Sequence, residues 1–358
     1  MKKLLNILLC LPLIGFGQQS DTCIVNQNFK IVVIGSSTAA GTGPSSVDSA
    51  WVWRYRSYLE SININNEVIN LAQGGYTTNH LMPTGFSWQS SNGTISYADS
   101  TKNISKALSL NPDGIIVNLP SNDAAYSYAI NYTMSNFDTI FNRAKEKSIP
   151  IWICTTQPRN FSWNPQILLQ TSCRDSIISR YGNFAIDFWS TIADTNNWID
   201  SQYDCGDGIH LNDAGHAVLY NRVKQSSVLE EIVKGKIPKV FLGNDTSVIS
   251  TILDAGYNSS SYLWSDGSVS QYLQLPNNVY NGNSWHTISV IVTDSNSCIN
   301  SDTIKVNFIS STHMVEYFYS KKIINEIDFL GRETKKKKNQ PYIYIYDDGT
   351  VEKRITIE

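Results

Sequence analysis

The strongest constraint on the fold is a series of short apolar runs that alternate with longer helix-like stretches. Four such runs occur, at Phe29–Ile34, Val68–Leu71, Gly114–Leu119 and Pro150–Cys154. Continuous apolar strands joined by helical crossovers are typical of a parallel sheet that is covered on both faces. We therefore predict an α/β domain over residues 28–235.

The stretches between and after these runs predict the helices. Trp51–Leu59 places its aromatic residues on one face, as an amphipathic helix does. Further helices are predicted at Tyr132–Lys147, Pro165–Tyr181 and Ala214–Val223. Asn212 or Asp213 precedes the last of them as the N-cap, because a short polar side chain can accept a hydrogen bond from the first turn.

The N-terminus has the order of a secretory signal peptide. Two lysines precede an apolar run that ends at Phe16, and Gly15–Gly17 forms a small-x-small cleavage site. The run is too short for a membrane-spanning helix, and no other segment is long and apolar enough to cross a bilayer. A buried N-terminal helix is the alternative, but the order of the residues favours a signal peptide over residues 1–17. We therefore expect a secreted or cell-surface protein that is exported through the periplasm.

The chain changes character after residue 235. Short alternating runs such as 287–292, separated by turn residues such as Ser265–Gly267, predict a small β-sandwich over residues 238–309. The last segment, residues 314–358, is β-rich and carries a lysine run at 335–338. A charged hairpin loop explains that run better than a nucleic-acid patch does. The formal net charge of −3 also gives no reason to expect a nucleic acid as partner.

Five cysteines remain if Cys10 is removed with the signal peptide. An oxidising compartment permits disulfides, but an odd count leaves at least one thiol free. Cys173 and Cys205 lie outside the strand-like runs, and we predict that they form a disulfide while Cys154 stays buried and free in its strand. The sequence has no CxxC or Cys/His pattern, so a zinc site is not expected.

Polar or glycine-containing loops follow the predicted strands. Because parallel strands end at one edge of a sheet, such loops meet there. The loops are Gly35–Gly41, Asn70–Thr78, Leu119–Asp123 and, before the last predicted helix, Asp207–Asn212. Each has an ordinary explanation when it is taken singly. A serine or asparagine caps a helix, a glycine pair makes a tight turn, and a lone histidine is structural.

Together these loops hold the groups that serine catalysis needs: a nucleophile, a base, a group that orients the base, and donors for the oxyanion. Ser37 follows a glycine turn, Gly75 can present a backbone N–H, and Asn122 can offer a side-chain amide. Asp207 stands three residues before His210, so it can bind one imidazole N–H and leave the other nitrogen basic.

A metal site is the alternative explanation of the last loop. Its candidate ligands are Asp204, Asp207, His210 and His216. The set lacks the softer or repeated ligands that transition metals select. We therefore favour a catalytic loop that needs no cofactor and no metal.

In this order the four loops resemble the four motif regions of the SGNH (GDSL-like) hydrolase family, over the whole predicted α/β domain. The resemblance implies a flavodoxin-like three-layer α/β/α fold. It implies Ser37 as nucleophile, His210 as base and Asp207 as the group that orients the base. It also implies that the backbone N–H groups of Ser37 and Gly75 and the side chain of Asn122 form the oxyanion hole.

One position departs from the family pattern. Ser36 stands where the family usually has an aspartate before the nucleophile, which leaves Ser36 as an alternative nucleophile. We favour Ser37 because of its position after the glycine and because the triad does not require the missing aspartate.

The C-terminal regions carry further resemblances. Residues 241–246, 253–256, 262–267 and 292–294 look like segments of an Ig-like or PKD-like module, common in surface proteins of Bacteroidetes bacteria. Cys298 matches a module cysteine that is often paired, but no partner stands near Val248, so we expect it to be free. The tail segments Ile327–Glu333 and Tyr344–Arg354 resemble C-terminal sorting tails of type IX secretion, which implies that machinery as a partner. A terminal hairpin that completes the sandwich is the alternative.

The sequence therefore predicts a secreted serine esterase that hydrolyses short acyl esters, with O-acetyl groups on carbohydrates as the expected substrates. A lysophospholipase-like lipid esterase is the alternative among enzymes, although no apolar lid is evident. The rival from another class is an inert surface protein that binds carbohydrate or adheres, and the complete set of site residues argues against it. The polar and aromatic stretch Met82–Asn103 either walls the site or is a surface excursion.

Overall fold

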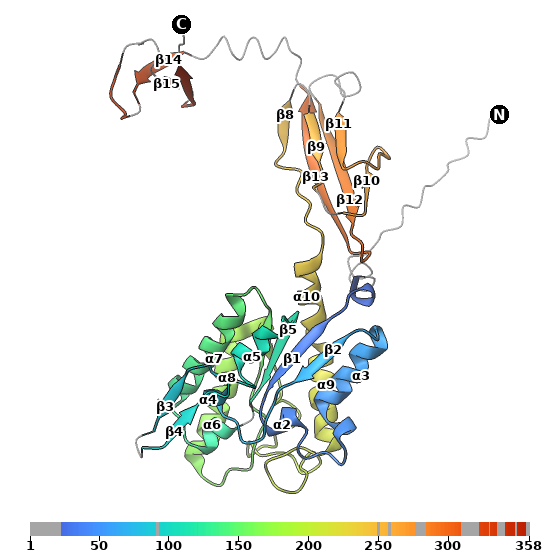
Figure 1. Ribbon diagram of the computed structural model, residues 1–358, viewed down its shortest axis with the longest axis vertical. Helices are drawn as coiled ribbons and strands as arrows, with labels where there is room; N and C mark the ends of the chain where they lie inside the picture. Colours follow the sequence, from blue (N-terminus) through green and yellow to red (C-terminus); the bar gives the residue numbers. More distant parts are fainter. Residues whose placement is uncertain are drawn as a thin grey trace, which may run out of the picture. The chain divides into compact units, whose positions relative to one another are not determined.

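The structure is a computed structural model (Figure 1). It describes residues 23–90, 93–119, 121–248, 251–256, 259–275, 284–308, 322–328, 330–334, 341–347 and 349–355. The predicted signal peptide at residues 1–17 lies outside them. The described chain divides into two compact units. One comprises the residues up to Ile237 with Asn296–Cys298, and the other comprises Pro238–Ser295 with the residues from Ile299 onwards.

The first unit is built on a five-stranded parallel sheet. Its strands are β1 (Lys30–Gly35), β2 (Glu67–Asn70), β5 (Gly114–Asn118), β6 (Ile151–Cys154) and β7 (Ala185–Ile186). Their order is β2-β1-β5-β6-β7, which is the order of flavodoxin-like folds. Val32 of β1, for example, pairs with Ile69 on one side and Ile115 on the other. The loops that follow β1, β2 and β5 therefore leave the sheet at one edge.

Three helices cover one face of the sheet. They are α3 (Trp51–Ile62), α9 (Asp213–Gln225) and α10 (Val228–Lys236). Trp51, Tyr55 and Leu219 from this layer share a buried core with Ile31 and Val33 of β1. Successive strand residues point to opposite faces, so the alternate residues of β1 are left for the other side.

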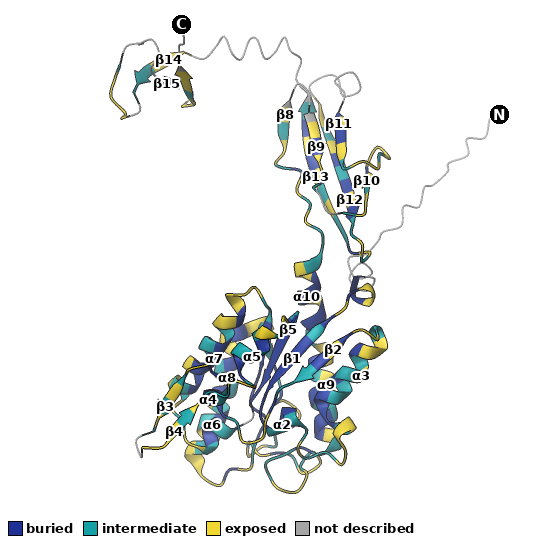
Figure 2. Cartoon of the chain, viewed as in Figure 1, coloured by how far each residue is buried: buried dark blue, intermediate teal, exposed yellow. Residues whose placement is uncertain are grey.

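Three further helices cover that other face. They are α5 (Ile104–Ser109), α7 (Ile130–Lys145) and α8 (Asn164–Tyr181). Ile104, Phe137 and Ile177 pack there against Val32 and Ile34 of β1. Because both faces are covered, the central strands are buried along almost their whole length (Figure 2).

Short elements fill the connections. They are α2 (Ser37–Ala40), the 3-10 helix η1 (Val47–Ser49), α4 (Thr78–Leu81), the hairpin of β3 (Ser87–Gln89) and β4 (Ile95–Tyr97), α6 (Asn122–Ala125) and the 3-10 helix η2 (Gly182–Phe184). The sequence pattern does not predict the helices α2, α4 and α6, because four residues are too few to show a helical period.

These observations confirm the predicted α/β/α fold. The four predicted strands and four predicted helices are present, with ends that differ by at most three residues. The N-cap of α9 is Asn212, whose side chain accepts the backbone N–H groups of Ala214 and Gly215. The fifth strand, β7, escapes prediction because its two residues form no apolar run. Within the described residues no helix is long and apolar enough to span a bilayer.

The second unit is β-rich. Its first strands are β8 (Thr246–Val248), β9 (Thr251–Asp254), β10 (Ser261–Trp264), β11 (Tyr272–Leu275), β12 (Trp285–Thr293) and β13 (Ile299–Phe308). They form a sheet of order β10-β12-β13-β8 and a two-stranded sheet of β11 and β9. Leu253 and Leu273 of the small sheet share one core with Trp264, Val290 and Val306 of the larger one. Two sheets over one core make the small β-sandwich that the sequence predicts.

The described end of the chain forms a third sheet in this unit. Its strands are β14 (Ile323–Ile327), β15 (Pro341–Tyr346) and β16 (Val351–Ile355), in the order β14-β15-β16. The lysine run at 335–338 lies outside the described residues, and the strands on either side of it are paired antiparallel. No described residue of this sheet pairs with a sandwich strand, so the tail does not complete the sandwich.

The predicted disulfide between Cys173 and Cys205 is wrong. Both thiols are free, with Cys173 buried in α8 and Cys205 exposed in a loop. The helix turns Cys173 into the core beside the sheet, which a rule that only excludes strands does not detect. Cys154 is buried and free, as predicted.

The prediction that Cys298 is free is also wrong. Cys298 forms a disulfide with Cys23, which stands 275 residues earlier. Gln27 Nε2 also donates a hydrogen bond to Cys298 Sγ over 3.1 Å. The partner lies outside the module, so a search around Val248 cannot find it.

Candidate active site

Ser37 lies where β1 turns into α2. It is the first residue of this short helix, and Ser36 is the N-cap. Gly35 is required before them because β1 passes close to β5. A Cβ atom on Gly35 would lie 2.1 Å from the carbonyl oxygen of Asn118. Ser36 is fully buried and Ser37 is partly exposed, so the second serine is the one that solvent can reach.

Asp207 and His210 form a hydrogen-bonded pair. His210 Nδ1 lies 2.6 Å from Asp207 Oδ2. The other carboxylate oxygen accepts the backbone N–H groups of Ile209 and His210, at 2.8 and 2.7 Å. Partial burial alone would raise the pKa of Asp207, but these hydrogen bonds outweigh it and lower the pKa to about 2. The ionised carboxylate holds the proton on Nδ1 and leaves Nε2 as the basic nitrogen.

The His210 loop docks against the segment that follows α2. A Cβ atom on Gly43 would lie 3.0 Å from the Cβ of His210, so the two backbones are in close contact. Ser45 donates through its backbone N–H and its hydroxyl to the carboxylate of Asp213, at 2.7 and 2.6 Å. These contacts bring the Asp207–His210 pair to the edge of the sheet where Ser37 lies.

His216 does not join the other three candidate metal ligands. It is fully buried, and its Nδ1 accepts the backbone N–H of Trp51 over 3.2 Å. Burial lowers the pKa of His216 to about 4, so the ring is neutral. The acidic group that the described residues form here is Asp204, Cys205 and Asp207, without a histidine. Both carboxylates in it already accept backbone N–H groups. His216 therefore joins α9 to α3 instead of binding a metal.

Two backbone N–H groups, that of Ser37 itself and that of Gly75, are candidate donors at the partly exposed Ser37. A Cβ atom on Gly74 would be 3.9 Å from the Cβ of Ser37, so the loop after β2 reaches the serine. Gly75 has a φ of +81°, a conformation that favours glycine, and it is exposed. The backbone N–H groups of Ser37 and Gly75 donate to no described residue. Both are available to a ligand.

Asn122 is the first residue of α6, at the end of β5. Its side-chain amide donates to Ser36 Oγ and to the carbonyl oxygen of Tyr76, each over 2.9 Å. The second bond fixes the amide relative to the loop after β2. The first bond shows what the buried Ser36 does: its hydroxyl is an acceptor for Asn122.

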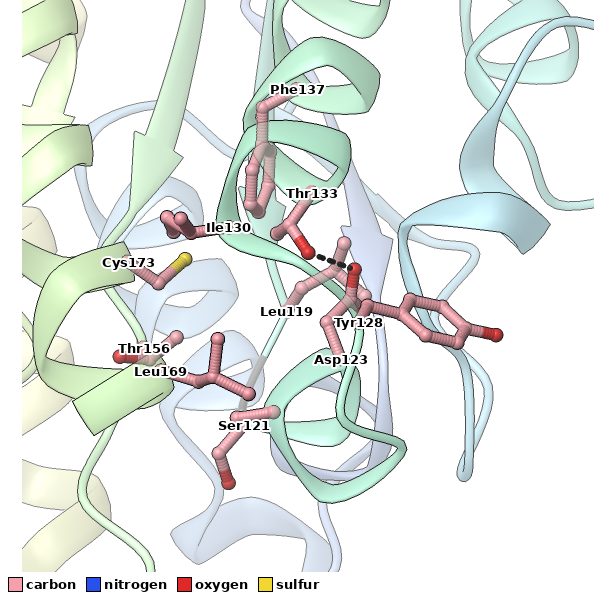
Figure 3. A pocket seen from close by; sticks show the side chains of 11 residues that line it. Leu119, Ser121, Asp123, Tyr128, Ile130, Thr133, Phe137, Thr156, Leu169 and Cys173 are labelled. Atoms are coloured by element: carbon pink, nitrogen blue, oxygen red, sulfur yellow. Dashed lines mark hydrogen bonds between the residues drawn. The ribbon is translucent and has the colours of Figure 1, made fainter. Parts of the chain in front are cut away.

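A buried polar network supports this side of the site. Asp123 accepts the backbone N–H and the hydroxyl of Thr78, at 2.9 and 2.6 Å, and the hydroxyl of Thr133, at 3.2 Å (Figure 3). Asn136 of α7 donates to Thr78 Oγ1 over 2.9 Å. Burial raises the pKa of Asp123, although these hydrogen bonds oppose the shift. The network ties α4 and α7 to α6, and so fixes the loop after β2 relative to Asn122.

A narrow cavity lies beside this network (Figure 3). Its walls are mostly apolar and include Leu119, Ile130, Phe137 and Cys173. Its volume of about 10 Å³ holds roughly one water molecule. It is too small for an acyl chain of a fatty acid.

Aromatic side chains flank α6. Trp88 of the β3–β4 hairpin packs on Tyr128 and Tyr132, with both ring-centroid distances at 5.2 Å. Tyr126 follows α6 directly, is 66% exposed, and has its ring centroid 6.1 Å from that of Tyr128. The stretch Met82–Asn103 is thus packed on the segment that follows α6 and is more than a free excursion.

The structure brings the five predicted site residues to one edge of the sheet. Sequence reasoning missed the residues that support them, because Asp123 and Ser36 act through partners far away in the sequence. Asp123 gave a weak signal, since it directly follows Asn122. Nothing in the linear sequence pairs Asp123 with Thr78, 45 residues earlier.

Comparison with known proteins points to one family. No curated protein matches the chain. One similar solved structure is a lipase/acylhydrolase from Enterococcus faecalis, with 18% identity, coverage of 60% of this chain and 100% of that chain, and a TM-score of 0.42. A second is an esterase from a Pseudoalteromonas species, with 13% identity, coverage of 58% of this chain and 100% of that chain, and a TM-score of 0.41. A third is a two-domain esterase active on acetylated mannans, with 16% identity, coverage of 62% of this chain and 54% of that chain, and a TM-score of 0.40. Residues 33–218 match the model of the GDSL-like Lipase/Acylhydrolase family, and this stretch contains all five predicted site residues.

Proposed function

Because the chain belongs to the GDSL-like lipase/acylhydrolase family of ester hydrolases, we propose that it cleaves short acyl esters through Ser37, His210 and Asp207. One observation carries the proposal. The loop of the hydrogen-bonded Asp207–His210 pair docks against the segment that follows the short helix on which Ser37 is the partly exposed first residue. A nucleophile, a base and a group that orients the base are the parts that acyl transfer to serine requires.

In the proposed reaction, Ser37 Oγ attacks the carbonyl carbon of the ester while His210 Nε2 takes the hydroxyl proton. Asp207 stabilises the imidazolium that forms. The imidazolium then gives its proton to the leaving alcohol, and an acyl-enzyme remains. Water attacks the acyl group with His210 again as base, the acid leaves, and the proton returns to Ser37.

The oxyanion of each tetrahedral intermediate binds the N–H groups of Ser37 and Gly75, which have no acceptor among the described residues. The amide of Asn122 is the third donor. It reaches the oxyanion by exchanging its bond to Ser36, while its bond to Tyr76 stays in place. Loss of one such donor typically removes about 2.7–4 kcal/mol of transition-state stabilisation.

We propose O-acetyl groups on carbohydrates as the substrates. The surroundings of the site are polar or aromatic: Gly74, Gly75 and Tyr126 are exposed, and Asn160 borders the Asp207 loop. A polar alcohol such as a sugar suits these surroundings.

The test is a pair of serine variants. S37A should abolish hydrolysis of p-nitrophenyl acetate and labelling by a fluorophosphonate, with circular dichroism unchanged. S36A should retain labelling, because Ser36 is buried and acts only as an acceptor. Loss of labelling in S36A but not in S37A would shift the nucleophile by one residue. A wild-type protein that neither reacts nor hydrolyses would support the inert binding protein instead.

A screen of p-nitrophenyl esters with acyl chains from two to sixteen carbons, together with acetylated glycans and a lysophospholipid, tests the substrate. We expect the highest kcat/KM for the acetyl ester. A rise in kcat/KM with chain length would favour the lipid esterase.

We propose further that the protein is secreted and that its tail directs export by type IX machinery. The support is the signal-peptide order of residues 1–17, the sequence of the tail, and the tail's separate three-stranded sheet. Deletion of Met314–Glu358 should leave esterase activity in vitro and strand the protein in the periplasm of its host. Normal surface display of the truncated protein would contradict the sorting role.

A further inference from the structure

A buried hydrogen-bonded path that the proposed mechanism does not use connects the nucleophile side of the site to the base side. It begins at Asn118, the last residue of β5, whose backbone carbonyl oxygen accepts the N–H of Ser36 over 3.0 Å. Gly35 and Asn118 are paired in the sheet, so Asn118 lies directly beside the turn that leads into Ser37. The position of Asn118 therefore fixes the backbone from which the nucleophile projects.

The side chain of Asn118 is bound by Trp51, the first residue of α3. The indole Nε1–H of Trp51 donates to Asn118 Oδ1 over 3.1 Å. Both residues are fully buried, and the Trp51 ring also packs edge-on against Phe188 with 5.6 Å between the ring centroids. The hydrogen bond fixes the orientation of this large ring, because a buried indole N–H that lost its acceptor would stay desolvated and unpaired. Trp51 thus holds α3 to the end of β5.

The backbone of Trp51 provides the next bond of the path. An α-helix leaves its first N–H groups without intrahelical partners, and the N-cap of α3, Ala50, makes no side-chain capping bond. His216 of α9 takes this role, since its Nδ1 accepts the N–H of Trp51 over 3.2 Å. The helices α3 and α9 lie side by side on the sheet (Figure 1), and this bond caps one helix from the other. The path therefore continues from β5 into the first turn of α9.

This first turn of α9 is packed tightly against the loop that carries His210. A Cβ atom on Gly215 would lie 2.7 Å from the Cβ of Leu211 and 3.1 Å from the carbonyl oxygen of Tyr203. The side-chain amide of Asn212, the N-cap, donates two further bonds to backbone carbonyl oxygens of the same loop, at 2.9 and 3.1 Å. A displacement of the first turn of α9 therefore moves the base with it.

We propose that Trp51 is a positioning residue for acyl transfer, which sets the distance between nucleophile and base by joining the end of β5 to the first turn of α9. The inference rests on the proposed function, because it takes Ser37 and His210 as the reacting pair. A second attachment, from Ser45 to Asp213, is exposed and stays in place when Trp51 is changed. Loss of the buried path should therefore misplace the base without releasing it. A misplacement of about 1 Å can slow a reaction roughly 100-fold.

The test compares W51F with W152F in the full chain. Phenylalanine keeps a ring in the core, but W51F removes the N–H that Asn118 accepts. Trp152 of β6 is the matched control, because it is equally buried and its indole N–H has no hydrogen-bond partner among the described residues. Active sites are counted by complete labelling with a fluorophosphonate, so that kcat for p-nitrophenyl acetate refers only to folded enzyme.

We expect W51F to lower kcat per active site about 10- to 100-fold with KM near the wild-type value, because proton transfer and not substrate binding is disturbed. The rate of fluorophosphonate labelling should fall by a similar factor, because it needs the same base. W152F should keep the wild-type kcat per site, even where its melting temperature falls. A merely structural role of Trp51 would lower the melting temperature and the number of active sites with kcat per site unchanged, and this result would overturn the proposal.

A second pair of variants tests the other bond of Trp51 and does not depend on the folding of W51F. H216L removes the acceptor of the Trp51 N–H, whereas the side-chain oxygen of H216N can take the place of Nδ1. We expect H216L to lower kcat per site about 10-fold and H216N to restore most of the loss. Wild-type kcat in both variants would overturn the proposal. An equal loss in both would also overturn it, because the hydrogen bond would then not be what matters.

Failure of the proposed function is seen separately. A wild type that neither reacts with a fluorophosphonate nor hydrolyses p-nitrophenyl acetate fails before any variant is compared. An active wild type with an unchanged kcat in W51F contradicts only the positioning role of Trp51.

Discussion

The two halves of the proposed site, the base side with Asp207 and His210 and the oxyanion side with Asn122, are held together in different ways. Asp207 and His210 are three residues apart, and their hydrogen bonds stay within one partly exposed loop. On the oxyanion side, Asn122 depends on Asp123, which is buried and bonded to a threonine 45 residues earlier. The first arrangement is local and can be found in a sequence. The second exists only after distant segments have packed.

The difference also determines whether a mutation on each side alters catalysis alone or catalysis and packing together. A change in the local loop alters chemistry and leaves packing almost untouched. A change in the buried network alters packing and chemistry together, because an unpaired buried group costs about 1–3 kcal/mol. The predictions below test this contrast.

The largest effect is expected at Asp207. D207N should lower kcat about 10,000-fold, because the amide would donate to Nδ1 and favour the wrong imidazole tautomer. The melting temperature should change little, since the loop is partly exposed and the amide oxygen can still accept backbone N–H groups. Steady-state kinetics and calorimetry on the same sample check both expectations. A fully active D207N would remove Asp207 from the triad.

The next effect concerns His216, which joins the helix after the base loop to α3. Its pKa is about 4 in the folded chain, chiefly because of burial, and about 6.5 in an unfolded one. Between these values the unfolded chain binds a proton that the folded chain does not. Stability should therefore fall as the pH drops from about 6.5 to 4, by about 3 kcal/mol in total from this group.

Urea unfolding at pH 7, 5.5 and 4 measures this slope. H216Q cannot titrate and should show a shallower decline than the wild type, whatever its absolute stability at pH 7. If the free energy of unfolding falls equally with pH in both proteins, a group other than His216 controls the loss of stability at low pH.

A smaller effect on turnover is expected at Asp123. D123A leaves the N–H and hydroxyl of Thr78 without an acceptor and frees the loop after β2 to move relative to Asn122. We expect kcat to fall about 10- to 100-fold, a part of what complete loss of one oxyanion donor costs. KM for p-nitrophenyl acetate should stay near the wild-type value.

D123N is the matched variant. Its amide oxygen can accept the N–H of Thr78, and its NH₂ can donate to the threonine hydroxyls, so most of the activity should return. If D123N is as poor as D123A although it folds, the charge of Asp123 is needed and not its hydrogen bonds.

The smallest effect should come from removing the second unit. All five proposed site residues precede Ile237, and α10 closes the first unit with an ion pair of 2.7 Å between Lys236 and Asp113. A fragment that ends at Ile237 should keep kcat within about threefold of the full chain on p-nitrophenyl acetate, because the first unit alone contains every proposed site residue. It also lacks Cys298, so C298S in the full chain is the control for the lost disulfide. Loss of activity in a folded fragment, but not in C298S, would show that the second unit contributes to the site.

The sequence by itself determined four of the five strands of the parallel sheet and its main helices, and it supplied the five proposed site residues. These features are repeated or local: apolar runs mark buried strands, and Asp207 and His210 lie within one turn of chain. Their periods and spacings survive in the linear order. The two-residue β7 and the four-residue helices α2, α4 and α6 carried too little pattern to be predicted.

Only the tertiary structure decided which residues support the site and which cysteines pair. Cys23 and Cys298 are 275 residues apart, Thr78 and Asp123 are 45 apart, and Ser36 reaches Asn122 across 86. Such partners share no spacing that a sequence could display, because they meet only where the packed sheet brings their loops to one place.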